Sequence, residues 1–92
     1  MARNLILTGG VVHPFDSAAP ALARVLAAHG VESTISEDFA AGLADLAAGT
    51  YDLLTIYALR WTMRQSERYA ADRARWALSL DAPSRRAITA HV

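Results

Sequence analysis

The chain contains no cysteine and no lysine, and its missing features narrow the functions open to it. Without cysteine it has no disulfide bond, no thiolate metal site and no cysteine nucleophile. It has no apolar run approaching the roughly 20 residues of a membrane-spanning helix and no signal-peptide core, so we expect a cytoplasmic protein without a membrane partner. It also lacks a Gly-x-Ser-x-Gly nucleophile elbow, a phosphate loop and a dinucleotide-binding glycine motif, so we expect no cofactor.

Charge is balanced overall but divided unevenly along the chain. Nine arginines match nine acidic residues, and a net charge of zero gives no general attraction to nucleic acid. Residues 1–59 carry two arginines and six acids, whereas residues 60–92 carry seven arginines and three acids. Asp72 lies four residues from Arg68 and three from Arg75. This spacing favours ion pairs on a solvated or subunit-facing helix, so we expect no nucleic-acid partner.

The most informative segment is residues 4–16, with the sequence NLILTGGVVHPFD. Residues 5–8 form a run of residues that favour strands or burial, with no charged residue among them, which is typical of a parallel strand covered on both faces. Gly9 and Gly10 follow at once, and we interpret them as a turn that lets another group approach the backbone closely. Ser17 is the predicted N-cap of the next helix. Because ligands of open α/β sheets bind outside the carboxyl ends of the strands, this segment predicts where a site lies.

Hydrophobic periodicity predicts alternating strands and helices along the chain. Strands are predicted over 4–8, 31–36 and 53–57, helices over 17–29, 39–48, 67–78 and 81–92, and an irregular segment over 58–66. Leu22, Val25 and Leu26 are spaced as the buried stripe of the first helix, and Ile88 and Val92 share a face of the last one.

This alternation predicts an α/β fold with a flavodoxin-like parallel sheet and flanking helices. Right-handed crossovers favour the strand order 2-1-3, with the first strand in the middle. Residues 1–92 form one predicted domain, which stops before a fourth strand and leaves the third strand as an apolar, unpaired edge. Natural proteins usually avoid such an edge, so we expect a partial domain or a subunit that covers the edge, including a homo-oligomer through strand three.

Several motifs together resemble the trehalose-utilisation (ThuA-like) family, whose fold is of the class I glutamine amidotransferase-like type. They are Leu5-Ile6-Leu7-Thr8-Gly9-Gly10, the His13-Pro14-Phe15 turn, Ala-Pro-Ala-Leu in the first helix, Tyr51-Asp52-Leu53-Leu54, residues 57–63 and residues 87–92. The resemblance covers nearly the whole chain but only the N-terminal half of the family domain, without its later glycine-rich strand and histidine-containing loop. It implies a role in carbohydrate utilisation, with a trehalose or keto-sugar derivative as the small-molecule partner.

Five residues are candidates for the site. His13 is the candidate catalytic residue, because an imidazole at a strand end can act as a general acid or base, or bind a sugar hydroxyl. Gly9 and Gly10 can shape a substrate-binding loop, and Arg60 with Trp61 can bind substrate by gripping hydroxyls and stacking on a sugar face. If the first and third strands are adjacent, all five residues meet in one hollow.

Simpler explanations exist for each candidate. The glycines can form a tight turn, His13 can cap or pack its loop, and Trp61 can be a packed side chain beside a solvated Arg60. The whole chain can be a non-catalytic remnant or interaction module that pairs its third strand with a partner, and a third alternative is nucleotide or flavin binding. We expect no metal site, because the two other histidines are predicted at the surface and no three ligands have metal spacing.

Overall fold

Three parallel strands form the centre of the computed structural model, which describes residues 1–92. β1 (Ala2–Gly10) lies between β2 (Val31–Ser36) and β3 (Leu53–Leu59), so the predicted fold class and strand order are confirmed. The helices are α1 (Phe15–Ala27), α2 (Phe39–Ala47), the 3-10 helix η1 (Glu67–Tyr69), α3 (Ala70–Trp76) and α4 (Ala82–His91). None of them has the length and apolar character of a membrane span.

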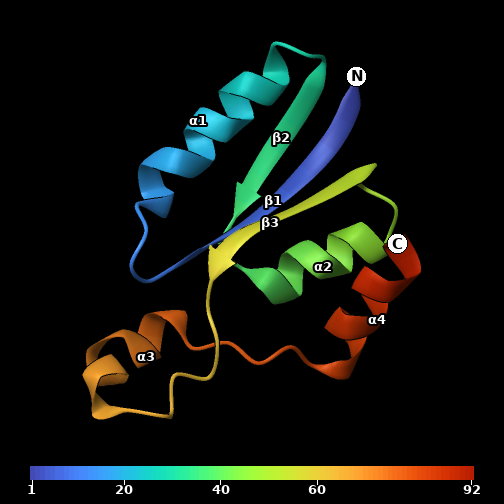
Figure 1. The fold of residues 1–92 in the computed structure, drawn as a ribbon. Helices are drawn as coiled ribbons and strands as arrows, with labels where there is room; N and C mark the ends of the chain where they lie inside the picture. Colours follow the sequence, from blue (N-terminus) through green and yellow to red (C-terminus); the bar gives the residue numbers. More distant parts are fainter.

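The helices form layers on both sides of the sheet, as the parallel connections require. Figure 1 shows α1 against one face, α2 and α4 beside each other on the opposite side, and α3 beyond the carboxyl end of the strands. Side chains alternate along β1, so one strand supplies the inner surface of both layers. The two faces of the sheet therefore carry different side chains of β1.

The face that packs against α2 is apolar and tightly closed. Leu5 and Leu7 of β1 pack with Leu43 of α2, and all three are at most 1% exposed. Their cluster also contains Phe39, Leu46 and Ala87. Gly42 allows the close approach of α2, because a Cβ there would lie 2.8 Å from Cδ2 of Leu7.

The face that packs against α1 carries a polar row across the sheet. The amide of Asn4, which is 1% exposed, donates to Oγ of Ser33 at 3.1 Å and accepts from Oγ1 of Thr55 at 3.0 Å. These bonds link β2, β1 and β3: Ser33 is matched in register with Asn4, and Thr55 is matched with Ile6, two residues further along β1. They satisfy the buried amide and specify the alignment of the strands.

The start of α1 differs from the prediction. β1 continues through Gly10, so the two glycines end the strand and the turn lies over residues 11–14. α1 begins at Phe15 rather than after a Ser17 cap, because the buried Phe15 ring anchors the first turn. The predicted stripe is also wrong at Val25, which is 60% exposed.

The segment after β3 largely follows the prediction. β3 extends to Leu59, an irregular segment follows, and η1 and α3 occupy the predicted helix over 67–78. Asp81 caps α4 by accepting from the backbone N–H of Ser84 at 2.8 Å. Val92 is fully exposed and does not share the packing of Ile88. The predicted ion pairs of Asp72 do not form, and the one salt bridge joins Arg75 to Glu37.

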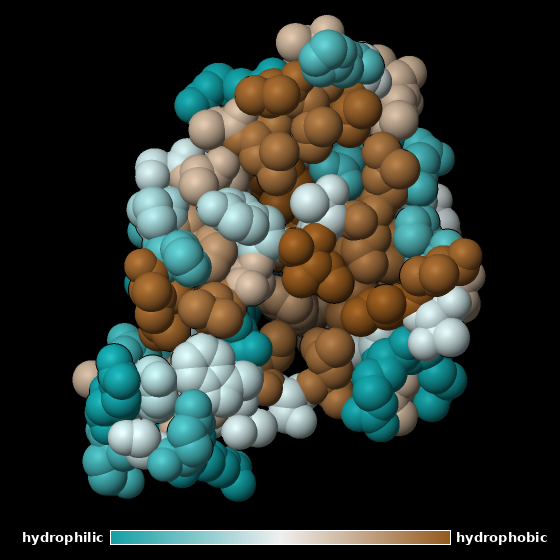
Figure 2. Space-filling model, viewed as in Figure 1, coloured by the Kyte–Doolittle hydropathy of each residue, from teal (hydrophilic) through white to brown (hydrophobic).

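The edge formed by β3 is apolar and pairs only with β1, as the sequence predicts. The sequence of β3 is LLTIYAL, without a charged residue. Its larger side chains remain exposed, at 44% for Leu53, 52% for Ile56, 36% for Tyr57 and 37% for Leu59. Figure 2 shows hydrophobic side chains gathered over the region of β3, with hydrophilic ones over α3 and the lower end of α4.

Candidate functional site

β1 and β3 are adjacent and parallel, so their carboxyl ends lie at one edge of the sheet. Gly9 is matched with Ala58, and Gly10 with Leu59. Arg60 follows directly after β3. The adjacency on which the predicted site depends is therefore confirmed.

Gly9 is needed for packing within the chain. Its φ is 109°, and a Cβ at this position would overlap the indole of Trp76. Gly10 has a φ of 128°, and a Cβ at this position would overlap the backbone carbonyl of Leu59. The groups that approach these backbones closely are thus an α3 side chain and the neighbouring strand.

The loop from β1 to α1 is strained and open to solvent. Val12 has a φ of 80° and is 81% exposed. A β-branched residue rarely adopts a positive φ, and such strain costs about 1–3 kcal/mol. His13 is exposed as well, with its ring edge-on to Phe15 at a centroid distance of 5.9 Å. Strained backbone of this kind clusters at functional sites, and here it presents an imidazole to solvent.

Arg60 holds together segments from three parts of the chain. Its Nη1 donates to the carbonyl of Glu37 at 2.7 Å, and its Nε donates to the carbonyl of Trp76 at 3.1 Å. The guanidinium carbon lies 5.0 Å from the ring centre of Phe39 and 5.4 Å from that of Trp76. Desolvation by burial lowers the pKa of Arg60, opposed by the nearby charges of Glu37 and Asp38. The remaining N–H groups of the guanidinium have no acceptor within the protein.

Trp61 is partly buried and held in a defined orientation. Its Nε1 donates to Oε1 of Gln65 at 2.8 Å, and its ring meets that of Tyr69 edge-on at 5.0 Å. Packing of Trp61 is therefore observed, and part of the side chain still faces solvent. Such an indole can offer a rigid apolar surface to a ligand.

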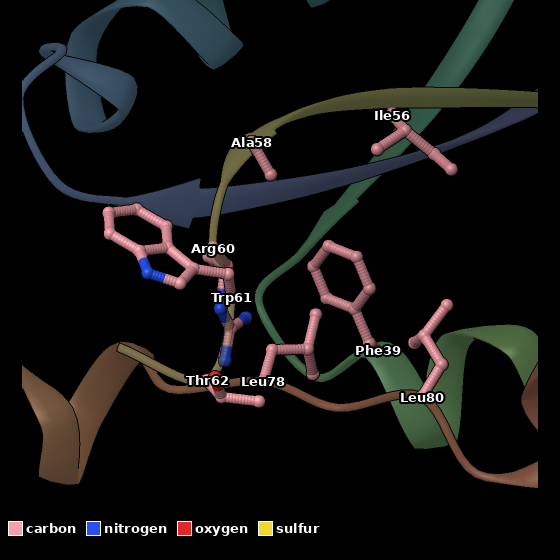
Figure 3. Close-up of a pocket in the computed structure, with 8 residues that line it drawn as sticks. All are labelled: Phe39, Ile56, Ala58, Arg60, Trp61, Thr62, Leu78 and Leu80. Carbon is pink, nitrogen blue, oxygen red and sulfur yellow. The ribbon is translucent and has the colours of Figure 1, made fainter. Parts of the chain in front are cut away.

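A cavity of about 410 Å³ opens beside Arg60 and Trp61. It lies between β3, the start of α2 and the segment before α4, and its lining is mainly apolar. Figure 3 shows Phe39, Leu78, Leu80 and Ile56 around the cavity, with Arg60, Trp61 and Thr62 at the end where β3 leaves the sheet. The cavity combines an apolar floor with a cationic end, which suits a ligand with an apolar face and polar substituents.

The five predicted site residues share one edge of the sheet but not one cavity. Arg60 and Trp61 line the cavity just described, whereas Gly9, Gly10 and His13 line none of the five cavities. The indole of Trp76 fills the space beside Gly9. Nothing in the sequence around Trp76, which lies in an arginine-rich segment, indicates that it packs on Gly9.

A second cavity, of about 290 Å³, lies at the same end of the sheet on the α1 side. Thr8 lines it, is 4% exposed, and its Oγ1 has no hydrogen-bond partner. Phe15, Asp16 and Glu37 also contribute to the walls. The sequence offered no signal for this hydroxyl, because Thr8 reads as the last residue of a buried strand.

No group of three or more metal-ligating side chains is assembled anywhere in the structure. His29 and His91 are exposed, as predicted. The polar groups at this end of the sheet include the Arg60 guanidinium and the His13 imidazole, together with the Thr8 hydroxyl and the carboxylates of Asp16 and Glu37. Comparison of the chain with protein-family models, curated proteins and solved structures found no match.

Proposed function

We propose that this chain is a ThuA-like protein of carbohydrate utilisation, which acts in the cytoplasm and binds a trehalose or keto-sugar derivative at the carboxyl edge of β1 and β3. The observation that carries the proposal is the parallel pairing of these strands, which brings the His13 loop and Arg60-Trp61 to one edge. Sequence resemblance supplies the substrate class. The apolar cavity with an arginine at its end supplies a surface of matching character.

Each residue has a defined part in this proposal. Trp61 stacks on the apolar face of a sugar ring, and the free N–H groups of Arg60 donate to sugar hydroxyls. His13, on its strained and exposed loop, moves over the bound sugar as the acid/base or hydroxyl-binding group. Gly9 and Gly10 let the end of β1 pass close to Trp76 and to β3, so that the loop over residues 11–14 starts at the carboxyl edge of the sheet.

Titration with trehalose and with its keto derivative, followed by NMR, tests this proposal. We expect the Trp61 indole N–H and the Gly10 amide to shift together. His13→Gln is expected to weaken binding by about tenfold, the loss of one good hydrogen bond to a ligand. His29→Gln is the matched control, since His29 lies in the exposed turn after α1. Unmoved signals, or equal binding by the His13 and His29 variants, would refute the sugar site.

We propose as a second candidate that β3 serves as an interaction edge. The support is its uncharged sequence and the exposure of four large side chains along a strand whose outer edge is unpaired. Hydrogen exchange of the β3 amides tests it with a peptide of alternating valine and threonine as the probe. Added peptide is expected to slow exchange in β3 but not in β2, and unchanged exchange in β3 would reject the edge function.

A further inference from the structure

The two outer strands of the sheet expose very different surfaces. β2 has the sequence VESTIS, with one acidic and three hydroxyl side chains, whereas β3 has no charge and one hydroxyl other than that of tyrosine. Charged or polar side chains on an edge strand discourage pairing with another chain. β2 carries this protection and β3 lacks it.

The backbone of β3 offers free hydrogen-bonding groups at every second residue. The carbonyl of Leu59 accepts the backbone N–H of Val11, which directly follows β1. Because strand residues alternate sides and the two strands keep one register, Thr55 and Tyr57 also direct their backbone groups to β1. Leu54 and Ile56 therefore direct their N–H and C=O groups outward, away from the sheet.

We propose that β3 pairs with β3 of a second copy of this chain, antiparallel and centred on Ile56, to form a continuous six-stranded sheet. This inference rests on the second proposed function, and it names the partner of that edge. A two-fold axis at Ile56 makes the contact isologous, so both copies use the same surface and the pairing closes.

This register matches the free backbone groups of the two copies. Ile56 of one copy lies opposite Ile56 of the other, and both carry the outward N–H and C=O groups that a hydrogen-bonded pair exchanges. Thr55 of one copy lies opposite Tyr57 of the other as a non-hydrogen-bonded pair, in which side chains are closest. A shift by one residue would set outward groups against inward ones and leave them unpaired.

The side chains are also self-complementary in this register. Leu53 meets Leu59, and Leu54 meets the small Ala58 at the mouth of the 410 Å³ cavity. Cross-strand apolar and β-branched pairs of this kind stabilise sheets. At each end, the acidic Asp52 is matched with the basic Arg60, so no like charges oppose each other. This complementarity favours a second copy over an unrelated strand.

Light scattering after size exclusion, together with single substitutions, tests the pairing. We expect a dimer, and Ile56→Lys is expected to raise its dissociation constant by about 100-fold, since it places two like charges at the centre of the interface. Ile35→Lys is the matched control, because Ile35 is 39% exposed on the opposite edge strand. It is expected to leave the dimer intact. Equal effects of the two substitutions would overturn the assignment to β3.

A cysteine introduced at position 56 tests the register. The chain has no other cysteine, and the Cα atoms of a hydrogen-bonded antiparallel pair are about 5.5 Å apart, within the range of a disulfide. Ile56→Cys is therefore expected to form a dimer under mild oxidation, whereas Thr55→Cys and Ile35→Cys are not. Crosslinking through Thr55→Cys instead would contradict the centring on Ile56.

Two outcomes distinguish pairing of β3 with a second copy from pairing of β3 with any other strand. A monomer in which the valine–threonine peptide still slows exchange of the Leu54 and Ile56 amides would overturn self-pairing and keep the edge function. A monomer in which the peptide has no effect would overturn both.

Discussion

The two faces of the sheet share the central strand but hold the molecule together by different means. Toward α2, β1 contributes Leu5 and Leu7, which are closed off from water by Leu43. Toward α1, the same strand contributes the buried Ile6 together with Asn4, in a hydrogen-bonded row, and Thr8, whose hydroxyl has no partner. We expect the apolar cluster on the α2 face to contribute more to stability than the α1 face, whose polar row helps to align the strands.

The largest effect is expected from truncation on the apolar face. Leu43 is 0% exposed, so Leu43→Ala is expected to lower the free energy of unfolding by about 2–5 kcal/mol through lost burial and a cavity. Leu22→Ala on the half-buried side of α1 is the matched control, with a smaller loss. Urea denaturation measures both. Equal losses would show that the two faces contribute alike.

The next effect concerns the contact between Gly9 and Trp76. Gly9→Ala is expected to cost roughly 2–4 kcal/mol, because it adds backbone strain and displaces the buried indole. Gly30→Ala has the same backbone problem, with a φ of 80°, but nothing lies within 4 Å of its Cβ position. It is expected to cost about 1 kcal/mol. Denaturation followed by tryptophan fluorescence measures the loss of unfolding free energy for both variants. Similar losses would mean that the Trp76 side chain can move away from position 9 without cost.

A pair of matched threonine substitutions probes the polar face. Thr55→Val removes the donor to Oδ1 of Asn4 and is expected to cost about 1–2 kcal/mol. Thr8→Val removes a buried hydroxyl that has no partner and is expected to stabilise by up to about 1 kcal/mol. Thermal and urea unfolding give both values. Destabilisation by Thr8→Val would show that its hydroxyl does find a partner.

The smallest effect is expected at the cap of α4, on the apolar side. Hydrogen bonding from the backbone N–H of Ser84 lowers the pKa of Asp81. Its carboxylate therefore adds stability above the pKa of the unfolded state, and this contribution is lost as pH falls through the folded pKa. Asp81→Asn keeps an acceptor but does not titrate, so its Tm is expected to fall less on acidification.

The measurement for this cap is Tm over a series from neutral pH to about pH 3, across the usual titration range of aspartate. Asp45→Asn serves as the control, because Asp45 is exposed on α2 and its side chain makes no hydrogen bond. A fall in Tm that is the same for Asp81→Asn as for the unmodified protein would contradict the role of the carboxylate.

Prediction from sequence succeeded where the signal was local and repeated. The apolar run at residues 5–8 identified the buried central strand and the run at 53–57 identified a second parallel strand, and the right-handed crossover rule then ordered them correctly. The error at the start of α1 had a physical cause, since burial of Phe15 outweighed the capping preference of Ser17. The five candidate residues lie at one edge of the sheet, but they do not share a cavity, because the indole of Trp76, distant in sequence, fills the space beside Gly9.

The order of residues alone determined the parallel sheet, its 2-1-3 arrangement and the exposed character of β3, because periodicity and short connections leave few alternatives. Only the tertiary structure decided that Trp76 packs on Gly9, that Arg60 bonds to two distant carbonyls, and that Thr8 is left without a partner. These contacts join residues far apart along the chain, and the space available to each side chain is set by several elements at once.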